Sequence, residues 1–491
     1  IKRTTEEVLD LEQARRALVD DLAAAVRAGE LATVSERINA LATAEPFWQT
    51  GEVRAHLDAK ASLRMLTALA ERLGAGMDPA MQRILELDPS SRVVLLYLAQ
   101  RALDSGQPRL GVDYAYRSMA LYFDDLIAQS LVIQGYGMLP GAGRPATAQS
   151  ANIDLSGKFC ARPFRHFEML SSGEVYVCCP SWLPVPIGNF KTSTYREIWN
   201  SPAAQGLRQS ILDGSFSYCS RFTCPHIQTG KLPDRDLVAS GGAEGIESYI
   251  VDAVRAGAVS LYGGPASANL AHDRSCNLSC PSCRTEVITA KRSEQEHLDQ
   301  IRDDVILPML RNATQVWISG SGDPFGSRHF RDVLGRLNPL DYPSLTIDLA
   351  TNGQLFTERE WAGLPNIHTM IGSVFVSIDA ADAETYAVLR RGGSFERLLT
   401  NMQFLSRLRK EGSIKSLSIA LVVQAGNFEQ MKAFVELGRS LSVDKVYFSR
   451  ICQWGTYSVD EFHRQDVCNP DNPLHPRLLE ILSDPIFDDP I

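Results

Sequence analysis

The chain has 491 residues, of which 44% are hydrophobic and 22% are charged, and its formal net charge is −9. This length provides apolar residues for more than one core, and we expect about two to four domains. No block of Lys and Arg suggests a surface for nucleic acid or anionic lipid, and no apolar run approaches membrane-spanning length, so neither partner is expected. The first residues are charged and helix-like rather than signal-like, which favours a cytoplasmic protein.

Residues 1–140 are expected to form a helical domain, because apolar residues recur at helical spacing in a sequence rich in Ala, Leu, Arg and Glu. One stretch resembles a single tetratricopeptide-type helical hairpin, and an irregular helical bundle is the alternative. The hairpin reading depends on small residues around a Gly106 turn, namely Ala99, Ala102, Ala115 and Ala120. The Gly- and Pro-containing segment 135–150 marks a domain boundary.

The ten cysteines group at short spacings in a large chain, which favours metal or cluster ligation over disulfides. Half of them fall in a small module expected over residues 151–240, where short strand-like pieces alternate with turn signals. These five are Cys160, Cys178, Cys179, Cys219 and Cys224.

Strand and helix patterns alternate from residue 260 to 455. The expected strands are 266–273, 314–319, 345–350, 374–379, 416–423 and 445–450, and amphipathic helices are expected at 293–310, 394–410 and 427–442. Repeated strand-helix units predict an α/β fold with a partial, TIM-like (β/α)6 barrel. Active-site groups gather at the C-terminal ends of such strands. The tail, residues 456–491, is expected to pack on the barrel.

Cys276, Cys280 and Cys283 follow the first of these strands in the segment CNLSCPSC. Three thiolates on one loop can hold three irons of a [4Fe–4S] cluster and leave the fourth iron open to a ligand with amino and carboxylate groups. A zinc knuckle or a set of buried thiols is the alternative, but zinc needs a fourth protein ligand that this loop lacks.

The C-x3-C-x2-C loop after the first strand of a six-unit half barrel resembles the radical S-adenosylmethionine superfamily, over about residues 266–455. The segment after the second strand is similar to the family's Gly-Gly-Glu-Pro-like stretch, which the resemblance assigns to the methionine moiety of S-adenosylmethionine. The matching residues are Ser321, Gly322, Asp323 and Pro324. Taken alone, this stretch would be an ordinary Gly-rich turn. The chain departs from the family at Ser282, where an aromatic residue is usual.

Polar residues at the later strand ends are expected to contact the same cofactor, because many members of the family use such positions. The candidates are Asn352, Ser377, Asp379 and Gln424. Asp379 could instead cap the following helix. Arg390 or Arg391 could meet a carboxylate, or could lie on a solvated basic turn.

The order of features from Cys160 to Cys224 resembles the SPASM or twitch modules that hold auxiliary [4Fe–4S] clusters. The resemblance implies a ligand set of Cys160, Cys178 or Cys179, Cys219 and Cys224, and a zinc ribbon is the alternative. The module precedes the barrel here, whereas it normally follows it. Cys452 could ligate a further cluster or donate hydrogen to a substrate radical, and both Cys452 and Cys468 could be plain buried thiols.

The resemblance implies reductive cleavage of S-adenosylmethionine and hydrogen abstraction by the 5′-deoxyadenosyl radical, with electrons from a flavodoxin- or ferredoxin-type donor. Oxidative modification of a peptide or protein is the leading expectation. Dehydrogenation or epimerisation of a sugar-like or aminocyclitol molecule is the alternative, and an iron–sulfur scaffold protein is the alternative of another class.

Overall fold

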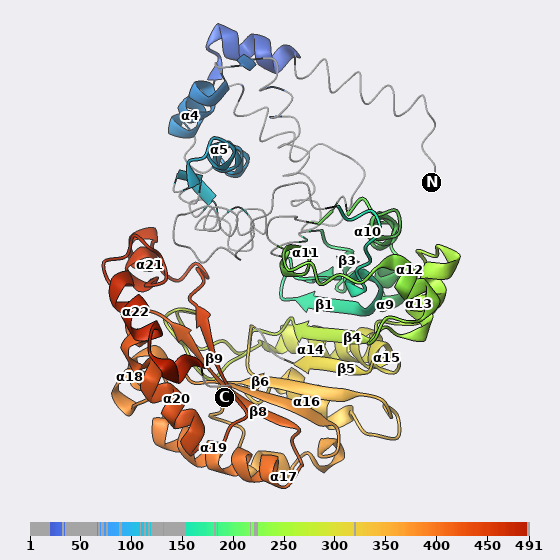
Figure 1. Ribbon diagram of the computed structural model, residues 1–491, viewed down its shortest axis with the longest axis vertical. Coiled ribbons are helices and arrows are strands. Elements are labelled where there is room, and N and C mark those ends of the chain that lie inside the picture. Colours follow the sequence, from blue (N-terminus) through green and yellow to red (C-terminus); the bar gives the residue numbers. More distant parts are fainter. Residues whose placement is uncertain are drawn as a thin grey trace. The chain divides into compact units, whose positions relative to one another are not determined.

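A computed structural model describes residues 154–488, apart from 181, 182, 184, 217, 220–223, 319 and 320, and scattered residues between 20 and 131. The chain divides into two compact units, Ile1–Leu139 and Pro140–Ile491 (Figure 1). The expected boundary at 135–150 lies outside the described residues.

The described parts of the first unit are helical. Helices α4 (Met77–Leu87) and α5 (Arg92–Asp104) pack together, and the Asp78 carboxylate accepts hydrogen bonds from Tyr97 and Arg101 across their contact. Ala99, Ala102 and Ala115 are buried, as a helical hairpin would require. Ala120 lies outside the described residues.

The second unit contains a nine-stranded sheet in the order β3-β2-β1-β4-β5-β6-β7-β8-β9. Its last six strands are parallel, and from β5 onward each pairs with the strand that precedes it in sequence. They are β4 (Ser267–Ala271), β5 (Gln315–Ile318), β6 (Thr346–Thr351), β7 (Ile371–Ser377), β8 (Ser416–Val423) and β9 (Lys445–Arg450). Consecutive parallel order is that of a barrel rather than of a doubly wound sheet. The expected α/β partial barrel is therefore confirmed, with β7 beginning at Ile371 rather than 374.

Helices between the strands cover one face of the sheet. They include α14 (Arg292–Ile301), α15 (Leu307–Leu310), α16 (Arg328–Arg336), α17 (Glu358–Ala362), α18 (Ala383–Leu389), α19 (Phe395–Lys410) and α20 (Met431–Ser440). Burial alternates along β7, so that Val374 and Val376 are buried while Phe375 and Ser377 are half-buried. The second set of side chains lies on the opposite face, which we call the open face; it carries Asn269, Trp317, Phe375 and Tyr447.

The expected helix 293–310 is interrupted by a π-helical turn, η2 (Arg302–Ile306), between α14 and α15. Pro308 has no backbone N–H and so cannot donate to residue 304, and the turn before it widens. The periodicity of apolar residues still predicted a helical segment over 293–310, because the apolar side chains before, within and after the widened turn are buried on the same side.

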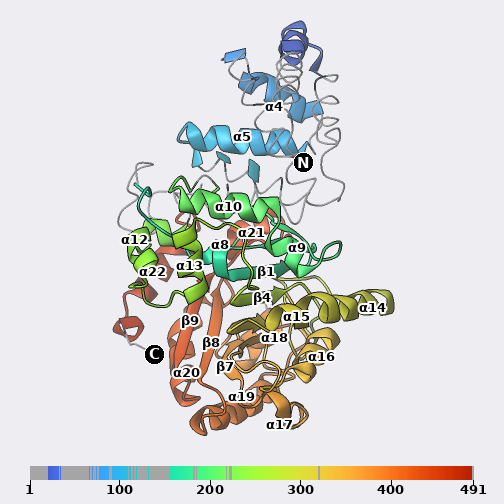
Figure 2. The ribbon, with the colours of Figure 1, turned by 90° about the vertical axis from the view of Figure 1, so that its right-hand side faces the viewer.

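The cysteine-rich module is joined to the barrel through the sheet. Its strands are β1 (His166–Leu170), β2 (Glu174–Tyr176) and β3 (Gly188–Asn189), and β1 pairs in parallel with β4 (Figures 1 and 2). Its helices are α8 (Arg162–Arg165), α9 (Tyr195–Trp199), α10 (Pro202–Leu212) and α11 (Pro225–Gln228), followed by α12 (Arg235–Ser240) and α13 (Ser248–Ala256). Gly173 turns the β1–β2 hairpin with a φ of 98°. The module therefore extends the barrel sheet at its β4 edge.

The segment after β9 forms α21 (Val459–Gln465) and α22 (His475–Leu482). The Ala425 N–H donates to the Gln465 carbonyl at 2.9 Å, and Arg450 pairs with the buried Asp466 at 2.5 Å. These contacts attach the segment to the ends of β8 and β9. Among the described residues, no helix combines the length and apolar character needed to cross a bilayer.

Candidate functional site

The loop after β4 gathers Cys276, Cys280 and Cys283 into one group of contacts around the buried Leu278. The Cys283 N–H donates to the Cys280 carbonyl at 2.9 Å, which makes a tight turn. The Cys276 N–H bonds to the Ile288 carbonyl at 2.9 Å and closes the loop. The loop therefore brings the three thiols together at the C-terminal edge of the sheet, as the spacing predicted.

Each of the three sulfurs lies near a nitrogen donor from another part of the site. Asn352 Nδ2 is 3.6 Å from Cys276 Sγ, Arg390 Nη1 is 3.8 Å from Cys280 Sγ, and Arg284 Nη2 is 3.4 Å from Cys283 Sγ. Burial raises the pKa of Cys276, although the Arg284 guanidinium opposes this rise. Sulfurs that receive N–H donors and lie beside cations suit the anionic thiolates of an iron–sulfur cluster.

Among the described residues, no group of three His, Cys, Asp or Glu side chains is arranged to hold a single metal ion. The cysteine loop supplies three sulfur donors, the ligand type of an iron–sulfur cluster. Sequence analysis did not identify Arg284; its signal was a basic residue directly after the last cysteine of the motif.

The segment after β5 is bonded to the start of the cysteine loop. Ser321 Oγ donates to the Ala271 carbonyl, and the Asp323 N–H donates to the Ser275 carbonyl at 2.9 Å. A Cβ on Gly322 would lie 2.4 Å from the Asp273 carbonyl oxygen, so only glycine fits there. Pro324 begins the turn that leads to α16. The segment therefore lies against the cysteine loop.

The Asp323 carboxylate is occupied by the chain itself. Oδ1 accepts from two backbone N–H groups of the next turn, at 3.0 and 2.9 Å. Oδ2 accepts from Thr351 Oγ1 at 2.7 Å and from the Asn352 N–H at 2.8 Å. The carboxylate thus ties the end of β5 to the end of β6 and holds Asn352 toward Cys276.

Asp379 and Arg390 form a buried ion pair at 2.8 Å, with side chains 4% and 11% exposed. Asp379 has a φ of 64°, and its carboxylate also accepts the Val422 N–H at 2.8 Å. Burial lowers the pKa of Arg390, but Asp379 and Cys280 outweigh burial and the pKa is raised. The helix-cap alternative for Asp379 is wrong, because Asp382 caps α18. The solvated-turn alternative is wrong for Arg390, whereas Arg391 is exposed and bonds to Ser279 Oγ at 3.1 Å.

The other strand-end candidates lie at the same edge of the sheet. Ser377 ends β7 and is half-buried. Gln424 follows β8 and is 1% exposed, and its side-chain oxygen has no hydrogen-bond partner among the described residues. A buried, unpaired acceptor at this edge fits a site that receives a ligand donor.

The remaining two cysteines lie apart from this group. Cys452 is exposed, so the buried-thiol alternative is wrong for it, and its Sγ is 3.9 Å from the Arg450 carbonyl. Cys468 is half-buried, and burial raises its pKa to about 11.

Four cysteines of the module line one cavity. They are Cys160, Cys178, Cys219 and Cys224, and Cys179 is not among the lining residues. The β1–β2 hairpin delivers Cys178 to the cavity, and Cys224 precedes α11. Burial raises the pKa of Cys160 to about 11. Four cysteines around one cavity match the ligand count of a [4Fe–4S] cluster and favour Cys178 over Cys179.

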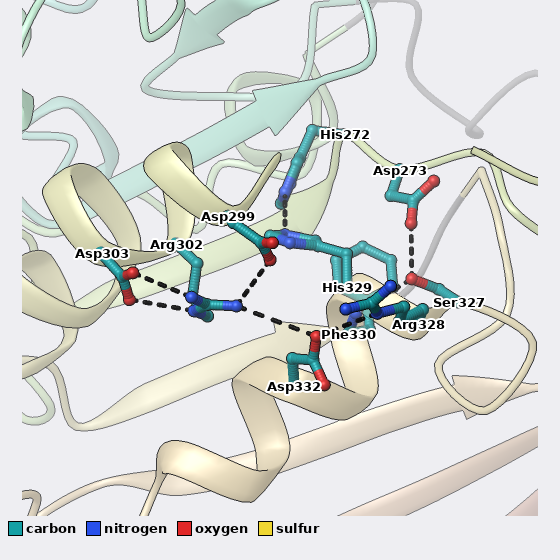
Figure 3. Close-up of polar contacts among 10 residues, drawn as sticks. All are labelled: His272, Asp273, Asp299, Arg302, Asp303, Ser327, Arg328, His329, Phe330 and Asp332. Carbon is teal, nitrogen blue, oxygen red and sulfur yellow. Dashed lines mark hydrogen bonds and ion pairs between the residues drawn. The ribbon is translucent and has the colours of Figure 1, made fainter. Parts of the chain in front are cut away.

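A buried histidine pair lies where the module meets the barrel, and sequence analysis did not identify it. His272 Nε2 and His329 Nε2 are 2.8 Å apart, and the two rings pack edge-on (Figure 3). Phe190 of the module and Phe330 also pack on the His272 ring. Burial lowers the pKa of both, that of His329 to about 4. In the part of the chain that the structure describes, neither Nδ1 atom has a hydrogen-bond partner.

Comparison with known proteins identifies the module. The family model of the SPASM domain, described as an iron–sulfur cluster-binding domain, matches residues 160–225. No curated protein matches the chain. The SPASM part of the resemblance drawn from the cysteine pattern is therefore confirmed, and the chain carries an iron–sulfur cluster-binding domain directly before its barrel.

Solved structures show only distant similarity. SuiB of Streptococcus suis bound to its precursor peptide SuiA is 14% identical with a TM-score of 0.32, over 61% of this chain and 63% of that chain. SuiB bound to S-adenosylmethionine is 15% identical with a TM-score of 0.33, over 58% and 63%. The protein anSMEcpe with bound AdoMet and the Kp18Cys peptide is 18% identical with a TM-score of 0.27, over 39% and 50%. The chain thus spans less than two thirds of the length of these structures.

Proposed function

We propose that this protein is a radical S-adenosylmethionine enzyme that oxidatively modifies a peptide or protein substrate. One observation carries the proposal: a three-cysteine loop, each sulfur with its own N–H donor, sits at the C-terminal edge of a parallel barrel that is continuous with a SPASM domain. A zinc knuckle would need a fourth protein ligand beside the three cysteines, and it would leave the strand-end groups without a role.

Cys276, Cys280 and Cys283 would hold three irons of a [4Fe–4S] cluster, and the open iron would accept the amino and carboxylate groups of S-adenosylmethionine. When bound, this group supplies the electron that cleaves S-adenosylmethionine to methionine and the 5′-deoxyadenosyl radical, which abstracts hydrogen from a C–H bond. The protein binds, orients and shields the reactants.

The strand-end residues supply the binding groups. The backbone of Ser321–Pro324 lies against the cysteine loop and would receive the methionine amino group, while Ser377 and the unpaired oxygen of Gln424 would face the rest of the cofactor. Asp323, Asp379 and Arg390 act as positioning residues, because their charged groups are bonded to the chain itself. Buried ion pairs of this kind hold the cysteine loop at fixed distance from the strand ends.

The SPASM cavity would hold an auxiliary [4Fe–4S] cluster through Cys160, Cys178, Cys219 and Cys224. Hydrogen abstraction removes one electron from the substrate, and net oxidation requires that a second electron leave. A cluster in a module that shares a sheet with the barrel is suited to take it. We propose a cytoplasmic flavodoxin- or ferredoxin-type protein as the electron donor.

The test is cleavage of S-adenosylmethionine by anaerobically reconstituted protein reduced with dithionite, read as 5′-deoxyadenosine by mass spectrometry. The wild type should form it, a Cys276→Ala, Cys280→Ala, Cys283→Ala variant should not, and a Cys468→Ala control should. Peptides encoded near the gene should then lose two hydrogen atoms. A wild type that never forms 5′-deoxyadenosine would leave only an iron–sulfur scaffold role.

A further inference from the structure

The module contributes side chains to the open face of the barrel sheet. β1 pairs with β4 so that Glu168 lies beside Asn269, and β4 pairs with β5 so that Asn269 lies beside Trp317. Side chains in register on neighbouring parallel strands point to the same face. Glu168, Asn269 and Trp317 therefore form one row that crosses the junction between the module and the barrel.

The amide of Asn269 has an unused acceptor. Its Nδ2 donates to Glu168 Oε1 at 3.4 Å, and a carboxylate only accepts, so the orientation of the amide is settled. This leaves Asn269 Oδ1 buried and without a hydrogen-bond partner among the residues that the structure describes. A buried acceptor left unpaired costs about 1–3 kcal/mol, and a ligand that donates to it removes this cost.

Aromatic rings continue the open face beyond this row. The ring centroids of Trp317 and Phe375 are 6.4 Å apart, and those of Phe375 and Tyr447 are 5.4 Å apart. Trp317 and Phe375 are half-buried, and Tyr447 is 43% exposed. Aromatic ring faces attract cations, with tryptophan the strongest of the three.

The charges around the row leave Glu168 available. Its nearest basic group is His166 Nε2 at 3.7 Å, and burial lowers the pKa of that imidazole and favours its neutral form. No Lys or Arg pairs with Glu168 among the described residues. Arg450 is paired with Asp466, and Lys445 lies on the far edge strand β9.

Two other carboxylates on this face, those of Glu174 and Asp348, are already bonded to the chain, and Glu174 accepts from the Tyr176 hydroxyl at 2.8 Å. Asp348 accepts from Gln315 Nε2 at 2.6 Å, from the Ser373 N–H at 2.6 Å and from Ser373 Oγ at 2.5 Å. Glu168 is thus the carboxylate on the row with capacity for a further donor.

We propose that Glu168, Asn269 Oδ1 and Trp317 form a subsite for a cationic group of the substrate, a protonated amine or a guanidinium. Strands about 4.8 Å apart place the backbones of Glu168 and Trp317 about 10 Å apart, on either side of Asn269, so that one cationic group above Asn269 could reach both side chains. Asn269 lies two residues before Ala271, so the subsite is about 7 Å along the strand from the bond to Ser321. This inference rests on the proposed function, because it names the substrate class of the same barrel.

A lysine or arginine side chain of a peptide and the amine of an aminocyclitol both carry this chemistry, so the experiment has two arms. Reconstituted full-length protein with S-adenosylmethionine, kept unreduced, is equilibrated with octapeptides that contain one central lysine or one norleucine between random flanks. In parallel it is equilibrated with an aminocyclitol or the corresponding inositol. Bound ligand is measured by mass spectrometry.

We expect the lysine peptides to bind about tenfold more tightly than the norleucine peptides. Glu168→Gln should abolish this preference, and Glu358→Gln on the exposed surface of α17 should retain it. Trp317→Phe should keep most of the preference and Trp317→Leu should weaken it, which tests the ring without a change of charge.

A preference for the aminocyclitol over inositol, with none for lysine peptides, supports the cation subsite and overturns the peptide as its source. The subsite is overturned if, in both arms, the cationic ligand binds no more tightly than its neutral counterpart. It is also overturned if Glu168→Gln and Trp317→Leu retain the full preference for the cationic ligand. Formation of 5′-deoxyadenosine by the same wild-type preparation is measured separately. A preparation that prefers cations but never forms 5′-deoxyadenosine contradicts the proposed function and supports the subsite.

Discussion

Replacing Arg390 with methionine removes the partner of the buried Asp379 carboxylate. The two charges are 2.8 Å apart with side chains 11% and 4% exposed, so water cannot take over the role of the guanidinium. Breaking a buried pair from one side costs about 3–5 kcal/mol, because a charge is left uncompensated. Adding Asp379→Asn removes that charge, and the amide oxygen can still accept the Val422 N–H. The double variant should therefore recover much of the lost stability.

Urea unfolding of the full-length protein, followed by tryptophan fluorescence, measures this free energy of unfolding for the wild type, both single variants and the double variant. The structure predicts that Arg390→Met is the least stable and that the double variant lies between it and the wild type. If the double variant is as unstable as Arg390→Met, the loss does not come from a stranded carboxylate, and the positioning role of the pair is refuted.

Three further predictions follow from the site. Gly322→Ala should prevent assembly of the cysteine loop, because its Cβ would meet backbone oxygens 2.4 and 2.7 Å away; iron content should fall by about four per chain, and an unchanged count would contradict the fit. Cys178→Ala should also lose about four irons whereas Cys179→Ala should keep them, and the reverse result would refute the ligand set. Burial depresses the pKa of His329 to about 4, so the native protein binds fewer protons than the unfolded chain and loses stability as pH falls below about 6.5. His329 should contribute roughly 2 kcal/mol to the stability lost between pH 7 and pH 4.5, so the loss measured by urea unfolding should be smaller by about that amount in a His329→Leu variant; an equal loss in that variant would exclude His329 as a cause.

Local patterns allowed the barrel and its cysteine loop to be predicted. The six parallel strands were visible as apolar runs between amphipathic helices, and the three cysteines of one loop are close in sequence as well as in space. Gly173, which turns the β1–β2 hairpin, and Cys178, which follows β2, are likewise close in sequence.

Contacts between distant segments could not be predicted in this way. The parallel pairing of β1 with β4 joins residues about a hundred positions apart, and nothing in either strand alone specifies its partner. His272 and His329 are 57 residues apart and look like isolated histidines in the sequence. The roles of Asp323 and Asp379 also depend on which distant N–H groups the fold brings to them. Strand-end polar residues therefore identified the site but did not separate ligand contacts from positioning contacts.

The central claim is that S-adenosylmethionine binds the cluster of the barrel loop and not that of the SPASM cavity. Electron paramagnetic resonance of the dithionite-reduced, reconstituted protein tests it directly. Addition of S-adenosylmethionine should change the spectrum of the wild type and of a Cys160→Ala, Cys224→Ala variant, and should leave the spectrum of the Cys276→Ala, Cys280→Ala, Cys283→Ala variant unchanged. A spectral change that persists in the last variant, or that is absent from the wild type, would contradict the account.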